Sequence, residues 1–342
     1  MASKLHILHH HSLRTLNTFG IDASAARYLK ITETAQLDAL YREPGLLEMP
    51  RLVLGGGSNL LLTHDFPGLV LHIATRGIAM TGEDEQYVFV TAQAGENWHG
   101  LVQWTLAQGL PGLENLSLIP GCVGAAPIQN IGAYGSEIAD YCHTLQVFDL
   151  KTGQIRSLNK SDCLFGYRDS VFKHGLHNHT VIINVTFALP KQWRPNLRYA
   201  ELVNELAACG VQAPTASDIS QAVIAIRTRK LPDPTKIGNA GSFFKNPVVT
   251  ADQRDALLAK HPALVSYSQT DGSYKLAAGW LIEQCGWKGK TIGAAGIHSQ
   301  HALVLVNHGG ASGADLLSLA NQVRDDVLEK FGVKLETEPV IV

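Results

Sequence analysis

The hydrophobic and polar positions in the first part of the chain alternate in short runs of β type. Runs of this kind, rich in Val, Ile, Leu and Tyr and bounded by turn residues, predict strands. They occupy residues 51–54, 69–73, 87–93, 144–150, 154–158 and 181–189. The fourth and fifth runs are joined by Lys151-Thr152-Gly153 and predict a hairpin. His9-His10-His11 shows no such pattern and is most simply a solvated terminus.

Helical periodicity appears between and after these runs. Asn97 can cap a helix whose apolar face runs through residues 98–106 and which ends before Gly109. Two further helices are predicted. One lies near residues 218–229 and ends at the Leu-Pro-Asp-Pro breaker, and the other lies near residues 275–285.

The C-terminal part carries a clear helix signal. Ser312 and Asp315 form a capping box for a last helix, which Gly332 ends. Residues 333–342 then predict a closing strand.

Composition narrows the class of protein. The 342 residues predict two or three domains at about 150 residues each. A net charge of −2 gives no field that attracts nucleic acid, so phosphate binding must be local. We find no secretory signal and no apolar run of about 18 residues. Five cysteines without a CxxC pair indicate free thiols. These features predict a cytoplasmic protein without a membrane partner.

Two glycine-rich segments are the main chemical signal. Gly55-Gly56-Gly57-Ser58-Asn59 directly follows a predicted strand, where backbone N–H groups can converge on an anion. It is neither a Walker A motif nor a G-x-G-x-x-G fingerprint, and by itself it can equally be a tight turn. The second segment, residues 119–135, is a long irregular stretch of Gly, Ala and Pro. Loops of this length without regular structure are usually functional.

Both segments resemble the flavin-binding module of the vanillyl-alcohol-oxidase, or PCMH, type. Eight sequence blocks in one order extend the resemblance over nearly the whole chain. They are NTFG at 17–20, GGGSN at 55–59, PGLENLSLIPGCVGAAPIQNIGAYG at 111–135, FGYRDSVFK at 165–173, RTRKLPDP at 227–234, GNAGSFFKNP at 238–247, DGSYKLAAGWLIEQCGWKG at 271–289 and LETEP at 335–339. Together they resemble the UDP-N-acetylenolpyruvoylglucosamine reductase (MurB) family, with a type I-like pattern.

The resemblance implies an α+β fold with a two-part FAD-binding PCMH-type module and a C-terminal α+β substrate-binding domain. Residues 1–76 would form the first FAD-binding part, to which the strand at 335–342 returns. Residues 77–231 would form the second part, and residues 232–334 the substrate-binding domain. We expect a monomer.

The implied activity is a step of peptidoglycan precursor synthesis. NADPH reduces non-covalent FAD, and a hydride from flavin N5 then reaches the vinyl carbon of UDP-N-acetylglucosamine enolpyruvate to give UDP-N-acetylmuramate. Such chemistry needs a cation on the substrate carboxylate and a proton donor for the adjacent carbon. We expect only small-molecule partners and no nucleic acid.

Three residues match the family's catalytic positions. Arg168 would hold the carboxylate, although an ordinary salt bridge with Asp169 is its simpler interpretation. Ser242 would be the general acid. Glu338 would assist protonation, but Thr337 stands where the family usually has proline between two glutamates, which leaves Glu336 as an alternative.

Further residues are carried over from the same blocks. The implied FAD-binding residues are Gly55, Gly56, Gly57, Ser58, Asn59, Pro120, Gly121, Gly124, Asn130 and Gly132. The implied substrate-binding residues are Tyr134, Tyr199, Arg227, Lys230, Asn246 and Tyr267, of which Tyr267 resembles the tyrosine of a mobile loop. His301 is at most a weak substrate contact. The histidines at 174, 177 and 179 are interpreted as surface residues, and no metal is expected.

Two other functions remain open at this level. One is an oxidase of small alcohols on the same module, with a flavin bonded to Cys122 or Cys163. The other is a non-catalytic protein that binds UDP-sugars.

Overall fold

The computed structural model describes residues 4–342, which group into two compact units. The first unit contains the N-terminal residues up to 11 together with residues 25–57 and 66–229. The second unit contains residues 12–24, 58–65 and 230–342. The three-part division at residues 76, 231 and 334 stays a prediction. No helix in the described part of the chain is both long and apolar enough to cross a membrane.

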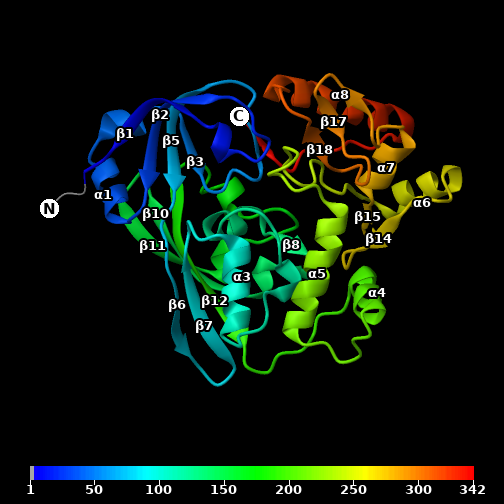
Figure 1. Cartoon of the computed structure of the whole chain (residues 1–342), viewed down its shortest axis with the longest axis horizontal. Helices are drawn as coiled ribbons and strands as arrows, with labels where there is room; N and C mark the ends of the chain where they lie inside the picture. The colour runs from blue at the N-terminus through cyan, green and yellow to red at the C-terminus, as the bar shows by residue number, and fades with distance from the viewer. Residues whose placement is uncertain (1–3) are drawn as a thin grey trace. The chain divides into compact units, whose positions relative to one another are not determined.

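The first unit is built on two sheets (Figure 1). One has the order β1-β2-β5-β3, formed by β1 (Ile7–Ser12), β2 (Ser24–Ile31), β5 (Phe66–Ile73) and β3 (Arg51–Leu54). Strand β5 pairs in parallel with β2 and with β3. The other sheet has the order β11-β10-β12-β7-β6, formed by β11 (Gln154–Asn159), β10 (Cys142–Asp149), β12 (Thr180–Pro190), β7 (Tyr87–Gln93) and β6 (Ile78–Glu83), all antiparallel.

Alternation of side chains along these strands builds one large core. Leu29, Ile31, Leu69, Leu71 and Ile73 point to one face of the mainly parallel sheet and are buried with Val90 and Ala92 of β7 and with Val185 and Phe187 of β12. Helix α3 (Trp98–Ala107) adds Trp98, Leu101 and Val102 to the same core. The short helices α1 (Ala35–Tyr41) and α2 (Pro44–Leu47) add leucines to it.

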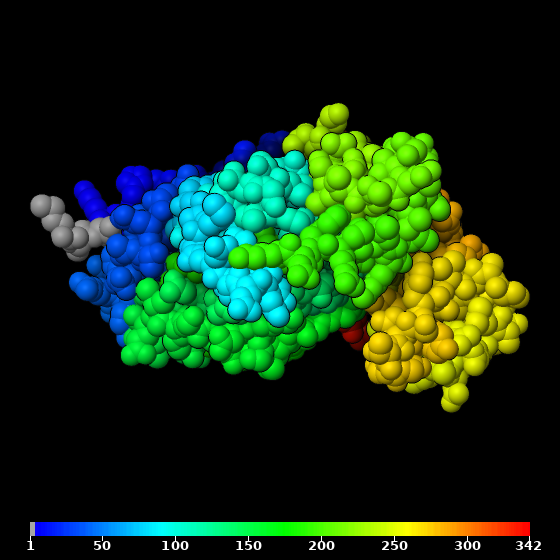
Figure 2. All heavy atoms as spheres, turned by 90° about the horizontal axis from the view of Figure 1, so that it is seen from below, coloured from blue at the N-terminus to red at the C-terminus, as the bar shows by residue number. Residues whose placement is uncertain are grey.

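A smaller apolar cluster lies at the end of the first unit. It joins α4 (Ala200–Ala208) to α5 (Ala216–Lys230) through six buried side chains, Leu202, Leu206, Ile219, Ala222, Val223 and Ile226. The segment between β12 and α4 crosses the surface of the unit (Figure 2): the backbone N–H of Lys191 bonds to Gln86, and the side chain of Asn196 reaches Gly135. This segment therefore connects the antiparallel sheet to the second glycine-rich segment.

Short elements complete the first unit. They are β8 (Gly132–Ala133), β9 (Ser136–Glu137) and the 3-10 turns η2 (Glu114–Leu116), η3 (Val123–Gln129), η4 (Ile138–Asp140), η5 (Lys160–Cys163) and η6 (Val171–Lys173).

The second unit combines short strands with three helices. The strands form three small sheets, β13 (Val248–Val249), β15 (Tyr274–Leu276) and β14 (Ser266–Ser268), then β16 (Thr291–Ile292), β17 (Ala295–Ile297) and β18 (Leu305–Asn307), then β4 (Leu60–Leu61) and β19 (Val340–Ile341). The helices are α6 (Ala251–Lys260), α7 (Ala278–Gln284) and α8 (Gly313–Phe331), and η1 (Arg14–Leu16) is a 3-10 turn. The parallel pair of β4 and β19 brings the C-terminus back to residues 60–61.

Elements with strong local signals are confirmed. The hairpin forms between β10 and β11, Asn97 caps α3 by accepting the N–H of Gly100, and Ser312 and Asp315 make the capping box of α8. Gly332 ends α8 with a φ of 66°.

Three local expectations are wrong. His9-His10-His11 lies in β1, where His11 stacks on Tyr28 with ring centroids 4.1 Å apart. The helix expected from residue 275 begins at Ala278, because Lys275 belongs to β15. The closing strand is limited to Val340–Ile341. In each case pairing with a distant segment decides the structure, and periodicity along the chain does not report such pairing.

Candidate active site

The two glycine-rich segments meet in the first unit. A side chain at residue 55 would overlap the sulfur of Cys122, and a Cβ at residue 56 would lie 3.1 Å from the Cα of Gly121. Gly124 is equally tight, because its Cβ would lie 2.5 Å from that of Ala94. Gly57 and Gly121 adopt φ values of 59° and 115°, which favour glycine. Close packing against neighbouring segments therefore leaves no room for a side chain at residues 55, 56 and 124.

Cys122 joins these segments. Its sulfur receives hydrogen bonds from the backbone N–H groups of Ala125, Gly56 and Gly124, while burial raises the pKa of the thiol. The side chain is therefore a neutral thiol that fills the space between the segments. Neither segment contains an acidic residue.

This arrangement fits a dinucleotide. Backbone approach without side chains and without negative charge suits the pyrophosphate of FAD. Pro120 is exposed, Gly121 is half-buried beside it, and Ser58 and Asn59 follow Gly57 in a turn. The side-chain amide of Asn59 donates to the carbonyl of Glu338 at 3.3 Å, within the second unit.

Asn130 shapes the loop that follows. It is buried with a left-handed φ of 44°, and its amide donates to Glu137 at 2.7 Å and to the carbonyl of Gly166 at 2.9 Å. Its Oδ1 accepts the N–H of Ala139 at 3.1 Å. The side chain is thus already engaged by protein groups, so any contact of Asn130 with a cofactor would come from its backbone.

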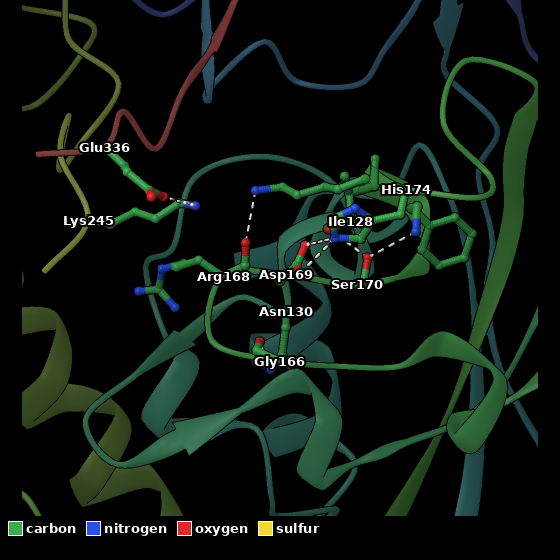
Figure 3. Close-up of polar contacts among 11 residues, drawn as sticks. Ile128, Asn130, Gly166, Arg168, Asp169, Ser170, His174, Lys245 and Glu336 are labelled. Atoms are coloured by element: carbon green, nitrogen blue, oxygen red, sulfur yellow. Dashed lines mark hydrogen bonds and ion pairs between the residues drawn. The ribbon is translucent and has the colours of Figure 1, made fainter. Parts of the chain in front are cut away.

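Arg168 lies in a turn fastened to the same loop (Figure 3). Its φ is 54°, its Nη2 donates to the carbonyl of Gly132 at 2.9 Å, and its own carbonyl accepts from Lys173 Nζ at 2.9 Å. Asp169 pairs with His174 at 2.8 Å. The carboxylate of Asp169 thus faces His174, and Nη2 of Arg168 is directed towards the second glycine segment.

Tyr134, Tyr199 and Arg227 come together in the first unit. The two rings are 5.2 Å apart in an edge-to-face arrangement, and Tyr134 is hydrogen-bonded to Arg227. Burial raises the pKa of Tyr134 to about 12 and lowers that of Arg227. Nε of Arg227 also donates to the carbonyl of Leu118 at 3.3 Å. The result is a cation beside two phenol groups, one of them half exposed.

Ser242 and Glu338 come together in the second unit. Ser242 forms a bridge with Val304, and the next residue, Phe243, is fully buried. The carbonyl of Phe243 accepts the N–H of Glu338 at 2.9 Å. Asn239 closes the turn before Ser242 by accepting the N–H of Gly241 at 3.0 Å. Two segments almost a hundred residues apart in the sequence are thereby held side by side.

Glu336 and Glu338 have different surroundings. Glu336 is mostly exposed and forms an ion pair with Lys245 at 3.2 Å (Figure 3). Glu338 is partly buried and follows Thr337, which forms a bridge with Phe244. Neither glutamate lies in a regular strand, and Thr337 between them forms the isolated bridge.

The other residues carried over also lie within the second unit. Lys230 ends α5 and is exposed. Asn246 accepts the N–H of Ala278 at 2.9 Å and so caps α7. Tyr267 is 54% exposed on β14, opposite Lys275 of β15. Burial, together with the charge of Lys230, lowers the pKa of His301.

Metal-ligating side chains do not gather. No group of three or more His, Cys, Asp or Glu side chains within residues 4–342 is placed to hold a metal ion. That the activity needs no metal stays a prediction.

Two buried polar residues lie close to Tyr134 and were not expected from the sequence. Glu114 and Asn115 are buried, and they bond to Trp193 and to the carbonyl of Tyr134 respectively. The only available signal was two polar residues inside the apolar run PGLENLSL.

Comparison with known proteins identifies the family. Residues 25–159 match the model of the FAD binding domain, and residues 233–342 match that of the UDP-N-acetylenolpyruvoylglucosamine reductase C-terminal domain. The chain is 56% identical to the UDP-N-acetylenolpyruvoylglucosamine reductase of Paraburkholderia phymatum over 96% of its length and 95% of that protein's. It is 54% identical to that of Burkholderia mallei, over 99% and 98%.

A solved structure agrees with this. The crystal structure of UDP-N-acetylenolpyruvylglucosamine reductase (MurB) from Thermus caldophilus matches with a TM-score of 0.68 and 25% identity, over 99% of this chain and 98% of that one. The α+β fold with an FAD-binding module and a C-terminal MurB domain is therefore confirmed. The chain belongs to the UDP-N-acetylenolpyruvoylglucosamine reductase family and is an FAD-dependent oxidoreductase.

Proposed function

We propose that this protein reduces UDP-N-acetylglucosamine enolpyruvate to UDP-N-acetylmuramate with NADPH, for peptidoglycan synthesis. Full-length identity above one half with reductases of that name supports the reaction. The structural observation that carries it is the close contact of the glycine segments at residues 55–56 and 121–124, where no acidic side chain is present. FAD, when bound, supplies the hydride carrier that links oxidation of NADPH to reduction of the substrate.

Arg168 is proposed to bind the substrate carboxylate. Hydride addition to the vinyl carbon pushes negative charge into that carboxylate, so a guanidinium held in place binds more strongly as the reaction proceeds. The turn around Arg168 is fixed by bonds to Gly132 and Lys173. This fixed geometry avoids a reorganisation cost during the reaction.

Ser242 is proposed as the proton donor and Glu338 as its partner in protonation. A serine hydroxyl is a weak acid in water, but a carbanion is basic enough to take its proton. The backbone bond from Glu338 to Phe243 keeps both side chains on neighbouring segments. Glu338 is preferred to Glu336 because its backbone bonds to Phe243, the neighbour of Ser242, whereas Glu336 is mostly exposed at the surface.

The remaining roles concern binding. We assign FAD contacts to Gly55, Gly56, Gly57, Ser58, Asn59, Pro120, Gly121, Gly124, Asn130 and Gly132, and contacts with the UDP portion to Tyr134, Tyr199, Arg227, Lys230, Asn246 and Tyr267. Arg227 and Lys230 supply positive charge for phosphates, and the tyrosines supply rings and hydroxyls. The side-chain amide groups of Asn130 and Asn246 already bond to other protein groups. These two residues are therefore proposed to act through their backbone or by supporting the structure.

We further propose a cytoplasmic monomer that acts on small molecules and binds neither nucleic acid nor membranes. Cytoplasmic substrates, free thiols and a net charge of −2 are consistent with this. In this proposal residues 1–76 with 335–342, 77–231 and 232–334 are the two FAD-binding parts and the substrate-binding domain.

The variant Ser242→Ala tests the assignment of the acid. We expect it to bind FAD and to be reduced by NADPH at the native rate, while substrate turnover falls by about 10²–10⁴-fold. Ser299→Ala, which alters an exposed serine of the second unit, is the matched control and should keep native turnover. Native turnover in Ser242→Ala would reject Ser242 as the acid.

A further inference from the structure

The segment from Gly112 to Leu118 makes several buried polar contacts in the first unit. Glu114 is 1% exposed and accepts from the N–H of Gly112 at 2.6 Å and from the indole N–H of Trp193 at 2.7 Å. The carbonyl of Leu118 accepts from Arg227 at 3.3 Å. The segment thus contacts both the surface segment before α4 and helix α5.

Asn115 makes two of the polar contacts of this segment. It is fully buried, and its amide nitrogen donates to the carbonyl of Tyr134 at 2.9 Å and to that of Asn196 at 3.0 Å. Its Oδ1 has no hydrogen-bond partner within the described residues. A buried acceptor without a partner is costly, so the two donors are what this side chain contributes.

One of these carbonyls belongs to a turn that needs support, and the other belongs to the irregular segment before α4. Tyr134 has a φ of 48° and Gly135 one of 82°, which for tyrosine is a sparsely populated conformation. Asn196 reinforces the contact by donating to the carbonyl of Gly135 at 2.8 Å and to Ser136 Oγ at 2.9 Å. Three residues after Asn196, Tyr199 places its ring against that of Tyr134. One amide therefore fixes both the turn that carries Tyr134 and the segment that leads to Tyr199.

We propose that Asn115 is a positioning residue for substrate binding, because its amide holds the turn of Tyr134 and the segment of Asn196 so that Tyr134 and Tyr199 face the UDP portion together. This inference rests on the proposed function, since it takes the tyrosine pair as part of the substrate site. Asn115 itself is enclosed by the protein and touches no substrate. Its effect is therefore transmitted through the tyrosines.

The isosteric variant Asn115→Asp tests the proposal. Aspartate keeps the shape but presents oxygen to two carbonyls, so both hydrogen bonds are lost and repulsion replaces them. We expect KM for UDP-N-acetylglucosamine enolpyruvate to rise by about tenfold, with kcat and FAD content close to native. If Asn115→Asp fails to fold, Asn115→Ser retains one donor, and a smaller rise of KM with native kcat is expected.

Ser220→Ala is the matched control. Ser220 bonds to Ser117 and Gln103 in the same neighbourhood but contacts neither carbonyl. The control should lower the melting temperature without a change in KM.

A double-variant cycle separates positioning from general destabilisation. If Asn115 acts through Tyr199, the change Asn115→Asp should raise KM by less than about twofold in a Tyr199→Ala background. The inference would be overturned if the rise of KM in the double variant equalled the product of the rises in the two single variants. It would also be overturned if the Asn115→Asp protein had native KM. Failure of the proposed function is distinct, because the native protein itself would then not turn over the substrate.

Discussion

At residues 55, 56 and 124 the backbone leaves no room for a side chain, and this shortage of space is the clearest property of individual residues near the glycine segments. Gly55 meets the sulfur of Cys122, whereas Gly175 has nothing within 4 Å of its Cβ position. Left-handed residues occur in the same region, at Asn130 and Tyr134. Together they describe a loop whose backbone conformation is fixed by its neighbours.

Gly55→Ala should therefore weaken FAD binding. The added methyl group forces Cys122 and its segment apart, and overpacking of this kind costs about 1–3 kcal/mol. We expect the dissociation constant for FAD, measured by flavin fluorescence on the apoprotein, to rise about tenfold. Gly175→Ala should leave it unchanged. Equal affinity in both variants would contradict the role given to the glycine contact.

Two partly buried tyrosines make stability sensitive to alkaline pH. Burial raises the pKa values of Tyr134 and Tyr141 to about 12, above the ordinary value of 10.0. The unfolded chain loses these protons at a lower pH than the folded protein does. Their contribution to stability is thus fully present below pH 10 and is lost as pH rises towards 12.

Tyr141→Phe should reduce this alkaline loss, because phenylalanine does not titrate. The measurement is the free energy of unfolding by urea at about pH 9 and about pH 11 for the native protein and the variant. An identical loss in the two proteins would show that Tyr141 does not contribute.

At the scale of elements, α3 is connected to α5 through the turn at Leu118. Nδ1 of His99, on α3, accepts the N–H of Leu118 at 3.0 Å, and the carbonyl of Leu118 accepts from Arg227 on α5. Burial, and then the charge of Arg227, lowers the pKa of His99 below 6.5. Protonation of Nδ1 would remove the acceptor for Leu118.

Acid should therefore weaken this connection. The unfolded chain binds a proton at His99 more readily than the folded one, so stability is lost as pH falls below 6.5. His99→Asn retains an acceptor but does not titrate, so we expect a smaller drop in melting temperature between about pH 7 and about pH 5. His177→Asn, at an exposed site, should retain the native drop. A native drop in His99→Asn would contradict this explanation.

Elements with complete local signals could be predicted from the sequence. Helix α8 carries its own cap, its apolar stripe and its terminal Gly332, and the β10–β11 hairpin carries its own turn. Strand β1 and the two-residue strand β4 could not be predicted, because only pairing with distant partners makes them strands, and the predicted closing strand forms only at Val340–Ile341.

At the scale of the whole molecule, the candidate site is assembled from segments far apart in the sequence. The family resemblance named Ser242 and Glu338 separately, but only the structure shows the bond between Phe243 and Glu338 that makes them neighbours. Asn115 could not be found in advance, since its role depends on two carbonyls 19 and 81 residues away. The function could be predicted because the motifs identify the chemistry. The supporting contacts could not be predicted, since they depend on how distant segments fold together.

The most direct test of the account follows the absorption of the purified protein under anaerobic conditions. NADPH should bleach the yellow flavin band, and UDP-N-acetylglucosamine enolpyruvate should then restore it as UDP-N-acetylmuramate forms. A protein without a flavin band, or a reduced flavin that this substrate fails to reoxidise, would contradict the assignment.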